Sequence, residues 1–522
     1  METELLRQKI LDLAVRGKLV PQEAEDEPAS VLLAQIKAEK EKLIKEKKLK
    51  KEKNPSYIFR GKDGLWYEQI GTKDPVCITD KIPFEIPDSW EWTYVGNIAF
   101  VTKLAGFEYT KYIAPNLCKE GIPLFKGKNV QDGKLVEQFE SYIPEKLSDE
   151  LTRSQITKKC LLLPYVGTIG NIAIYSGNYK AHLGSNVGKI ELIGEGISEK
   201  FVLFYLKSCF GYKELTKTKK ATAQESISIE AIRNVIIAVP PLAEQKRIVK
   251  KVETCFAAIK TIETNRDELE KLADSVKEKV LAAAVSGKLL AQDAADEPAA
   301  ALLARIEAEK AALIKAKKLK KEKNPTRIVR GKNGGFFEVS LSVHSGRSEM
   351  GNGKWEMDGA TDISDQLPFE IPESWEWVRL GTITYPVGNK NNQILAKEVK
   401  PEGSIPVVSQ GSNLIDGYTD KSDKVIKDLP LIMFGDHTKN VKYIDFEFVI
   451  GADGTKFHKV LGCDVKYIYY WMIYAASKLR DRGYARHYTL LKESFIPLPP
   501  LAEQERIAAR VREIFATLDE LH

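Results

Sequence analysis

The feature that most constrains this chain is an internal duplication. Three landmarks occur twice: VLLAQIKAEKEKLIKEKKLKKEKNP at 31–55 and ALLARIEAEKAALIKAKKLKKEKNP at 301–325, PFEIPDSWEW at 83–92 and PFEIPESWEW at 368–377, and PPLAEQKRIV at 240–249 and PPLAEQERIA at 499–508. The first pair is identical at 19 of 25 positions. A repeat on this scale predicts two copies of one structural unit.

Two dissimilar inserts lie between the second and third landmarks. They occupy 93–239 and 378–498, differ in length and show almost no mutual sequence resemblance. Each has short β-type runs separated by turns, and helical stretches at 201–209 and 467–477, so we expect mixed α/β domains. Two similar frames suit a chain that binds the same kind of partner twice. Two dissimilar inserts suit a chain that recognises two different targets.

Apolar residues from Ile248 to Ala283 predict one long helix. They recur with an alternating four-three spacing, which is the pattern of a coiled coil, and Gly287 is a suitable terminator. The C-terminal copy keeps this spacing from Ile507 onward, and the N-terminal segment 3–13 continues it. We therefore expect the two ends of the chain to complete the pattern of the central helix and to close the molecule into a pseudo-twofold ring.

A lysine-rich helix is also predicted in each frame, over 27–53 and 297–323. Its lysines could contact phosphates, but glutamates alternate with them, as on a solvated helix face. The solvated face is the favoured interpretation.

Composition narrows the class of protein. A single hydrophobic core stops growing near about 250 to 300 residues, so 522 residues need several domains. The 6 cysteines stand singly, which predicts neither disulfides nor a zinc site and favours a reduced compartment. No apolar run reaches the roughly 18 residues that span a bilayer, and no signal peptide is recognisable, so we expect a cytoplasmic protein without a membrane partner. A net charge of +6 permits nucleic-acid binding.

No motif predicts catalysis or a metal site in this chain. Asn-Pro-Ser-Tyr at 54–57 is similar to a base-flipping NPPY motif, but its copy has Arg327 in place of the aromatic residue. Glu-Gln-Lys at 244–246 suggests a nuclease pair, but its copy ends in Glu505. The stretch 121–128 has five residues where a phosphate-binding loop has four.

Polar loops of the inserts are the candidate base-reading groups. In the first insert they are 126–131, 167–171 and 217–226, and in the second they are 409–413, 435–440 and 483–488. Amides pair with adenine, Arg and Lys with guanine, and hydroxyls hold phosphate. For any single residue an ordinary surface turn is the simpler interpretation, so the loops are stronger candidates than their members.

This layout resembles the specificity subunit of a type I restriction-modification system. The PPLAEQ motif, the PFEIP-x-SWEW motif and the run FGDHTKNVKYIDFEFVIGADG all resemble that family, and the likeness covers essentially the whole chain. It implies a noncatalytic DNA reader of α/β (α+β) class, with two mixed α/β target-recognition domains separated by long antiparallel coiled-coil helices in a pseudo-twofold circular arrangement. Each domain would read one half of an asymmetric bipartite site in double-stranded DNA, and the helices would fix the gap.

The resemblance also implies partners and sites. Two methyltransferase subunits and the restriction endonuclease/translocase subunits would join this chain, and S-adenosylmethionine, ATP and Mg are expected in those partners and not here. Methyltransferase docking is placed on the long helix, including Ile259 and Val276. The residues predicted to contact DNA are Lys126, Lys128, Asn129, Thr168, Asn171, Lys219, Gln224, Gln410, Asn413, His437, Lys439, Arg486, His487 and Tyr488.

The corresponding domain boundaries are 1–60 for an N-terminal helical frame, 61–239 for the first target-recognition domain with its lead-in, 240–325 for the central helical region, 326–498 for the second target-recognition domain with its lead-in, and 499–522 for the C-terminal helix. Two other classes stay open. One is a reader for a fused methyltransferase-nuclease of another restriction type. The other is a coiled-coil scaffold with two protein-binding heads, whose DNA affinity would be weak and independent of sequence.

Overall fold

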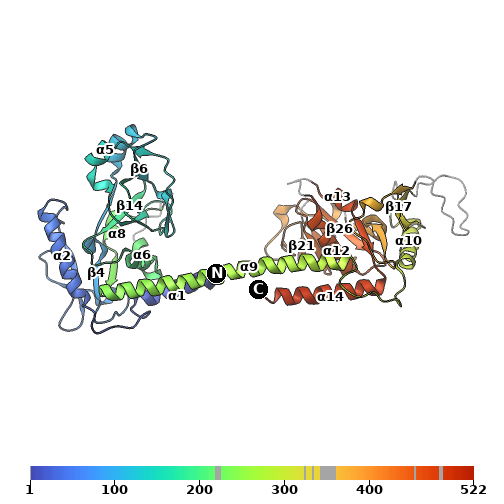
Figure 1. Ribbon diagram of the computed structural model, residues 1–522, viewed down its shortest axis with the longest axis horizontal. Helices are drawn as coiled ribbons and strands as arrows, with labels where there is room; N and C mark the ends of the chain where they lie inside the picture. The colour runs from blue at the N-terminus through green and yellow to red at the C-terminus, as the bar shows by residue number, and fades with distance from the viewer. Residues whose placement is uncertain are drawn as a thin grey trace, which may run out of the picture. The chain divides into compact units, whose positions relative to one another are not determined.

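The computed structural model describes residues 2–217, 225–321, 325–331, 334–340, 360–388, 390–451, 454–480 and 486–521. They form two compact units, Met1–Asn265 and Arg266–His522, each built from helices and strands (Figure 1). The predicted mixed helix-and-strand fold is confirmed. Within the ranges given above, no helix is both long enough and apolar enough to cross a bilayer.

Helix α9 (Leu242–Val285) is the long helix that the apolar spacing predicted, and the boundary between the units falls inside it. It ends just before Gly287, whose φ of 72° is the left-handed conformation that commonly terminates a helix. The N–H of Lys288 then bonds back to the carbonyl of Ala283 at 2.9 Å. The predicted seam is only partly buried, because Ile262 and Leu269 are exposed.

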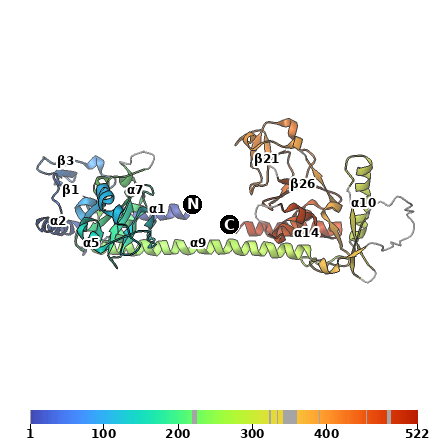
Figure 2. The same cartoon turned by 90° about the horizontal axis from the view of Figure 1, so that it is seen from above.

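Each terminal helix lies beside the part of α9 that belongs to its own unit (Figures 1 and 2). In unit 1, α1 (Glu2–Val15) is joined to α9 by two hydrogen bonds from the guanidinium of Arg7 to the carboxylate of Glu263, at 2.8 and 2.7 Å. In unit 2, Lys277 of α9 pairs with Asp519 at the end of α14 (Leu501–Asp519).

The repeated frames fold alike. Unit 1 has α2 (Ala29–Lys45) and the antiparallel sheet β1 (Ser56–Arg60), β2 (Trp66–Ile70) and β3 (Val76–Cys77). Unit 2 repeats them as α10 (Ala299–Lys315), β16 (Thr326–Arg330), β17 (Phe336–Ser340) and β18 (Thr361–Asp362). The strand that carries the WEW landmark then pairs with the strand before PPLAEQ: β4 (Glu91–Tyr94) with β15 (Ile236–Val239), and β19 (Glu376–Arg379) with β27 (Phe495–Leu498). This pair closes the base of each insert.

The two inserts share one topology despite their unlike sequences. The central antiparallel sheet has the order β12-β11-β14-β5 in unit 1 and β24-β23-β26-β20 in unit 2. The strands are, in unit 1, β5 (Ala99–Lys103), β11 (Cys160–Pro164), β12 (Ala173–Tyr175) and β14 (Val187–Leu192), and in unit 2, β20 (Thr384–Val387), β23 (Leu431–Gly435), β24 (Val441–Ile444) and β26 (Thr455–Val460). β11 and β23 are buried along their whole length, and any apolar set that fills this position can specify the same sheet.

A second sheet in each insert contains a parallel pair: β6 (Ile122–Phe125) with β13 (Ala181–Leu183) in unit 1, and β21 (Ile405–Val408) with β25 (Val449–Ile450) in unit 2. Helices follow the sheets: α6 (Glu199–Lys207), α7 (Cys209–Thr216) and α8 (Ile229–Arg233) in unit 1, and α12 (Val465–Lys478) and α13 (Tyr488–Lys492) in unit 2.

A buried carboxylate of the PPLAEQ landmark joins the parts of each frame that flank the insert. Glu244 accepts a hydrogen bond from the indole Nε1 of Trp90 at 2.8 Å and another from the amide of Gln22 at 2.7 Å. Its copy Glu503 accepts bonds of 2.8 Å from Trp375 and 2.7 Å from Gln292. These repeated contacts explain why Trp, Glu and the proline turn recur together in the sequence.

Candidate nucleic-acid interface

In unit 2 the described parts of the three loops predicted from the sequence lie together, and residues 483–485 of the third loop are outside the described residues. The side-chain Oε1 of Gln410 accepts the N–H of His437 at 3.2 Å. The backbone carbonyl of Gln410 accepts the hydroxyl of Thr438 at 2.7 Å and the amide of Asn440 at 2.9 Å. These bonds join the loop after β21 to the loop after β23, at one end of the central sheet.

Asp436 brings the third loop to the same place. It is 5% exposed, and its N–H donates to the carbonyl of Gly454 at 2.7 Å. Its own carbonyl accepts the N–H of His487 at 2.9 Å, and its Oδ1 accepts the N–H of Tyr488 at 2.8 Å. We call segments 409–413, 435–440 and 486–488 the unit-2 loop cluster.

The predicted residues of this cluster differ in exposure. Asn413 and Arg486 are exposed, while Gln410, His437 and Lys439 are half-buried. Lys439 has a φ of 60°, a left-handed conformation that costs a non-glycine residue about 1 kcal/mol or more. The exposed side chains are the ones that can reach a ligand directly.

His487 and Tyr488 support the cluster from inside. His487 is 1% exposed, and its Nδ1 lies 3.1 Å from the carbonyl oxygen of Asp436. The ring of Tyr488 packs beside Phe434 and His458, with ring centroids 6.3 and 5.5 Å apart. Burial raises the pKa of Tyr488 to about 12 and lowers the pKa of His458 to about 4, so both side chains are neutral near pH 7.

Unit 1 uses the same backbone scaffold with different side chains. Tyr165 stands where Asp436 stands: its N–H donates to the carbonyl of Asn186 at 3.1 Å and its carbonyl accepts the N–H of Ile227 at 2.9 Å. Gly184 donates to Phe125 at 2.7 Å, as Gly451 of unit 2 donates to Val408 at 3.0 Å. We call segments 126–131, 165–171, 184–186 and 225–227 the unit-1 loop cluster.

Lys126 and Lys128 lie on the first loop of this cluster. The ammonium of Lys126 donates to the hydroxyl of Ser141 at 2.9 Å. Lys128 is exposed and pairs with Glu140, and the hydrogen bond from Lys128 lowers the pKa of that carboxyl. Lys128 is therefore free to exchange one anionic partner for another at the surface.

Asn129 is placed differently from what the sequence suggested. It is 2% exposed, its Oδ1 accepts the N–H of Lys126 at 2.9 Å, and its amide donates to the carbonyls of Val136 at 2.8 Å and Gln138 at 3.2 Å. An amide used this fully inside the chain holds the shape of the loop and is not presented at the surface.

Thr168 and Asn171 lie on the second loop. Thr168 is exposed between Gly167 and Gly170, which have φ values of 85° and 101°. The amide of Asn171 donates to the carbonyl of Val130 at 3.2 Å and so joins the second loop to the first. The predicted residues Lys219 and Gln224 lie outside the described residues.

Sequence reasoning missed several residues of the two clusters. Tyr165 was not predicted, and Asp436 was not named individually although it lies in the predicted loop 435–440. Each directly follows a run of buried strand residues. Lys103 was also missed, and its ammonium lies 4.2 Å from the centroid of the Tyr165 ring. Phe107, four positions after Lys103, is 68% exposed, which is unusual for so large an apolar side chain.

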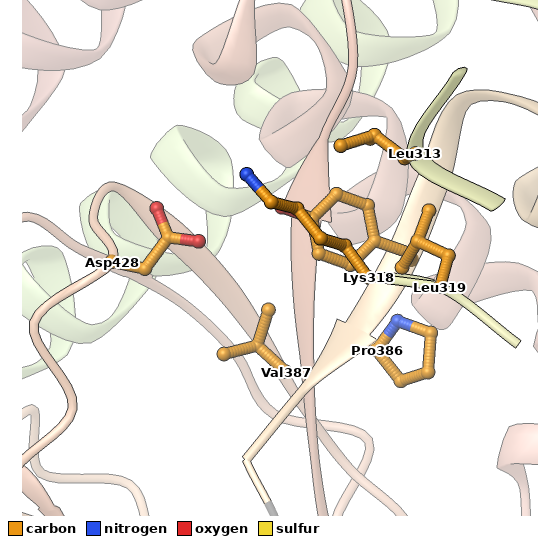
Figure 3. Close-up of a pocket in the computed structure, with 7 residues that line it drawn as sticks. Leu313, Lys318, Leu319, Pro386, Val387 and Asp428 are labelled. Carbon is orange, nitrogen blue, oxygen red and sulfur yellow. The ribbon is translucent and has the colours of Figure 1, made fainter. Parts of the chain in front are cut away.

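A hollow of about 320 Å³ in unit 2 lies apart from the loop cluster (Figure 3). It is lined by Leu313, Lys318, Leu319, Tyr385, Pro386, Val387 and Asp428. Asp428 precedes the first residue of β23, whereas the loop cluster follows the last. In the part of the chain that the structure describes, no three His, Cys, Asp or Glu side chains are grouped as metal ligands would be.

The two residues predicted to dock a partner lie on α9. Ile259 is 2% exposed and belongs to the hydrophobic core of unit 1, so its side chain is covered by the chain itself. Val276 is half-buried. More exposed apolar side chains occur nearby in each unit, with Leu5 at 72% and Ile262 at 56% in unit 1, and Leu272 at 61% in unit 2.

Comparison with known proteins bears on the whole chain. The sequence model of the type I restriction modification DNA specificity domain matches residues 105–271 and 372–522, more than half of the chain. The chain is 27% identical to the type I restriction enzyme EcoAI specificity subunit of Escherichia coli, over 99% of this chain and 89% of that protein. It is 24% identical to the putative type I restriction enzyme MjaX specificity subunit of Methanocaldococcus jannaschii, over 82% of this chain and 88% of that protein.

A solved structure from work on complex assembly and conformational transition of the type I R-M system is similar in fold. It aligns with a TM-score of 0.52 at 17% identity, over 84% of this chain and 93% of that one.

Proposed function

Because the chain belongs to the family of type I restriction-modification DNA specificity subunits, we propose that each of its two units reads one half of an asymmetric bipartite site in double-stranded DNA. One observation carries the proposal. The residue after the central strand makes the same two backbone bonds in both units, and it is Tyr165 in one and Asp436 in the other. One scaffold that presents two sets of side chains suits two half-sites of different sequence.

The exposed members of each cluster have the chemistry that DNA recognition requires. Arg486 and Lys128 are cations that can pair with guanine or phosphate, and the amide of Asn413 can pair with adenine. Thr168 offers a hydroxyl for a phosphate. The buried members, such as Asn129 and His487, position the loops.

The repeated frames support a partner that binds twice. Exposed apolar side chains on helices, such as Leu5 and Leu272, suit the docking of two methyltransferase subunits. Restriction endonuclease/translocase subunits would join that assembly in the cytoplasm. S-adenosylmethionine, ATP and Mg would bind to the partners, and adenine methylation and cleavage would be carried out there and not by this chain.

A pseudo-twofold circular arrangement would place the frames symmetrically. It is supported by the shared apolar spacing of α1, α9 and α14, and by the pairing of each terminal helix with its own part of α9. A distance measured between spin labels near the two termini tests it, because short distances are expected and labels at opposite ends of the particle would exclude the ring.

Sequencing of methylated adenines in cells that carry the chain and its methyltransferase partner tests the proposed function. We expect one asymmetric sequence in two parts with a fixed gap. Methylation without sequence preference would contradict the proposal and favour a scaffold role, and methylation by the chain alone would contradict the division of labour.

A further inference from the structure

A buried lysine holds the first loop of the unit-2 cluster. Lys442 of β24 is 5% exposed. Its ammonium donates to the carbonyl of Ser409 at 2.6 Å and to the carbonyl of Asn413. Those are the first and last residues of the loop 409–413, so one charge fixes both ends of the loop.

Asp416 completes this arrangement. Its carboxylate accepts the N–H of Ser409 at 3.0 Å and lies 3.9 Å from the ammonium of Lys442. Burial lowers the pKa of Lys442, and the nearby carboxylate opposes that shift. A lysine is rarely buried unless its donors are used, and here two of them go to backbone carbonyls of one loop.

Asp436 joins the other two loops through its backbone and one carboxylate oxygen. Its backbone bonds to Gly454 and His487, and its side chain accepts the N–H of Tyr488 at 2.8 Å. Lys442 and Asp436 therefore hold the three loops of the cluster from inside, while Asn413 and Arg486 remain exposed.

Unit 1 does not repeat the lysine. The register of the central sheet places Ala173 opposite Leu162, as Lys442 lies opposite Met433. In unit 1 the corresponding loop is held by the buried amide of Asn129 instead. The residue that fixes this loop therefore differs between the two units. The DNA sequence that each unit reads is proposed to differ as well.

We propose that Lys442 and Asp436 are positioning residues that set the base specificity of the second half-site without contacting DNA themselves. This inference rests on the proposed function. Base discrimination requires donors and acceptors held to within a fraction of an ångström, and loops that lose their support accept more than one base. Loss of the Lys442 ammonium, or of the Asp436 oxygen that accepts the N–H of Tyr488, should therefore broaden the second half-site. The first half-site, which is read by the other unit, should stay unchanged.

The test uses the full chain, co-expressed with its methyltransferase partner, and sequences methylated adenines for each variant. We expect Lys442→Met and Asp436→Ala to reduce discrimination at one or more positions of the second half-site by about tenfold, the size of one typical base-pair mismatch. Asp436→Asn keeps an oxygen acceptor for the N–H of Tyr488 and should restore the discrimination.

Lys459→Met is the matched control. Its ammonium also makes two hydrogen bonds in unit 2, to the carboxylate of Asp428 at 2.6 Å and to the carbonyl of Leu429 at 2.7 Å. Both acceptors lie before the start of β23. It should leave both half-sites unchanged. An equal broadening by Lys459→Met would show that general destabilisation is the cause and would overturn the inference.

The first half-site reports whether each variant is folded and assembled. A variant that recognises the first half-site and also keeps full discrimination at the second half-site would overturn the inference and leave the proposed function intact. If either variant fails to assemble, the other variant tests the same inference independently. A wild-type chain that shows no preference for a bipartite site would instead reject the proposed function.

Discussion

Replacement of Glu244 by glutamine perturbs the buried carboxylate that joins the parts of the first frame on either side of its insert. The carboxylate is 1% exposed and accepts two hydrogen bonds, from Trp90 at 2.8 Å and from Gln22 at 2.7 Å. Glutamine keeps one oxygen, and its amide nitrogen would then face a second donor. Either the N–H of Trp90 or that of Gln22 would lose its acceptor, and the new amide group of the glutamine would be buried against that donor.

The size of the effect follows from these contacts. A hydrogen bond to a charged group contributes about 1.5 to 3 kcal/mol, and a buried donor left without an acceptor costs about 1 to 3 kcal/mol. Burial raises the pKa of Glu244, so neutralisation recovers part of this loss. We expect unit 1 to lose about 2 kcal/mol near pH 7, which corresponds to roughly a thirtyfold increase in the open population.

The raised pKa also gives the pH dependence its sign. The folded state holds the proton of Glu244 more tightly than the unfolded chain does. This contribution to stability is therefore fully present below the ordinary glutamate pKa and is lost as the pH rises through the folded-state pKa. Glu244→Gln should lack that dependence.

Hydrogen exchange measured by mass spectrometry resolves the two units separately, which a single melting curve of a two-unit chain does not. Peptides around Trp90 should exchange about thirtyfold faster in Glu244→Gln, at a free energy of about 1.4 kcal/mol per factor of ten, and peptides around Trp375 should not change. Glu503→Gln should give the reverse pattern. Glu253→Gln is the control, because that carboxylate is exposed and pairs only with Lys200 in the described structure. Unchanged exchange in unit 1, or equal acceleration in both units, would show that the Glu244 carboxylate does not stabilise unit 1 through these bonds.

Three further outcomes are expected. The hydrogen bond from Arg379 lowers the pKa of Glu338, so the contribution of Glu338 to stability is present above the ordinary glutamate pKa and is lost as the pH falls through the folded-state pKa. Acid unfolding of Arg379→Met should lack this component, and an acid transition equal to that of the wild type would contradict the expectation. A Cβ at Gly451 would lie 2.9 Å from the side chain of Val407, so Gly451→Ala should weaken recognition of the second half-site in a methylation assay while the first is retained, and weakening of the first alone would contradict the assignment. Lys128→Gln should make the salt dependence of duplex binding by the assembled complex shallower by about 0.9 in log–log slope if Lys128 neutralises one phosphate, and an unchanged slope would exclude that contact.

The frames and the long helix could be predicted because their signals are local or repeated. The spacing from Ile248 to Ala283 gave α9, and Gly287 gave its end. Trp90 and Glu244 both lie in repeated landmarks, but the bond between them could not be predicted, because the two residues are 154 positions apart. Sequence periodicity predicts helices and strands, but it does not predict which residue a side chain contacts after folding.

The loop clusters could also be predicted only in part from the sequence. The loops that contain Gln410 and His437 were found from their polar composition, and the structure brings them together. Asn129 carries the chemistry of a base-reading amide, yet its bonds are used inside the loop. Asp436 looks like an ordinary turn residue in the sequence, and only its burial beneath three loops shows its role. The common topology of the inserts was equally hidden, because unlike apolar side chains fill the same strands.

The central claim is that one scaffold reads two half-sites independently, each through its own insert. The most direct measurement is the methylated-adenine sequence produced by a chain that carries the second insert, 378–498, in both frames, with 93–239 removed, assembled with the methyltransferase partner. We expect both halves of the methylated site to take the sequence of the original second half, and the original first half to disappear. Retention of the original first half by this chain would contradict it.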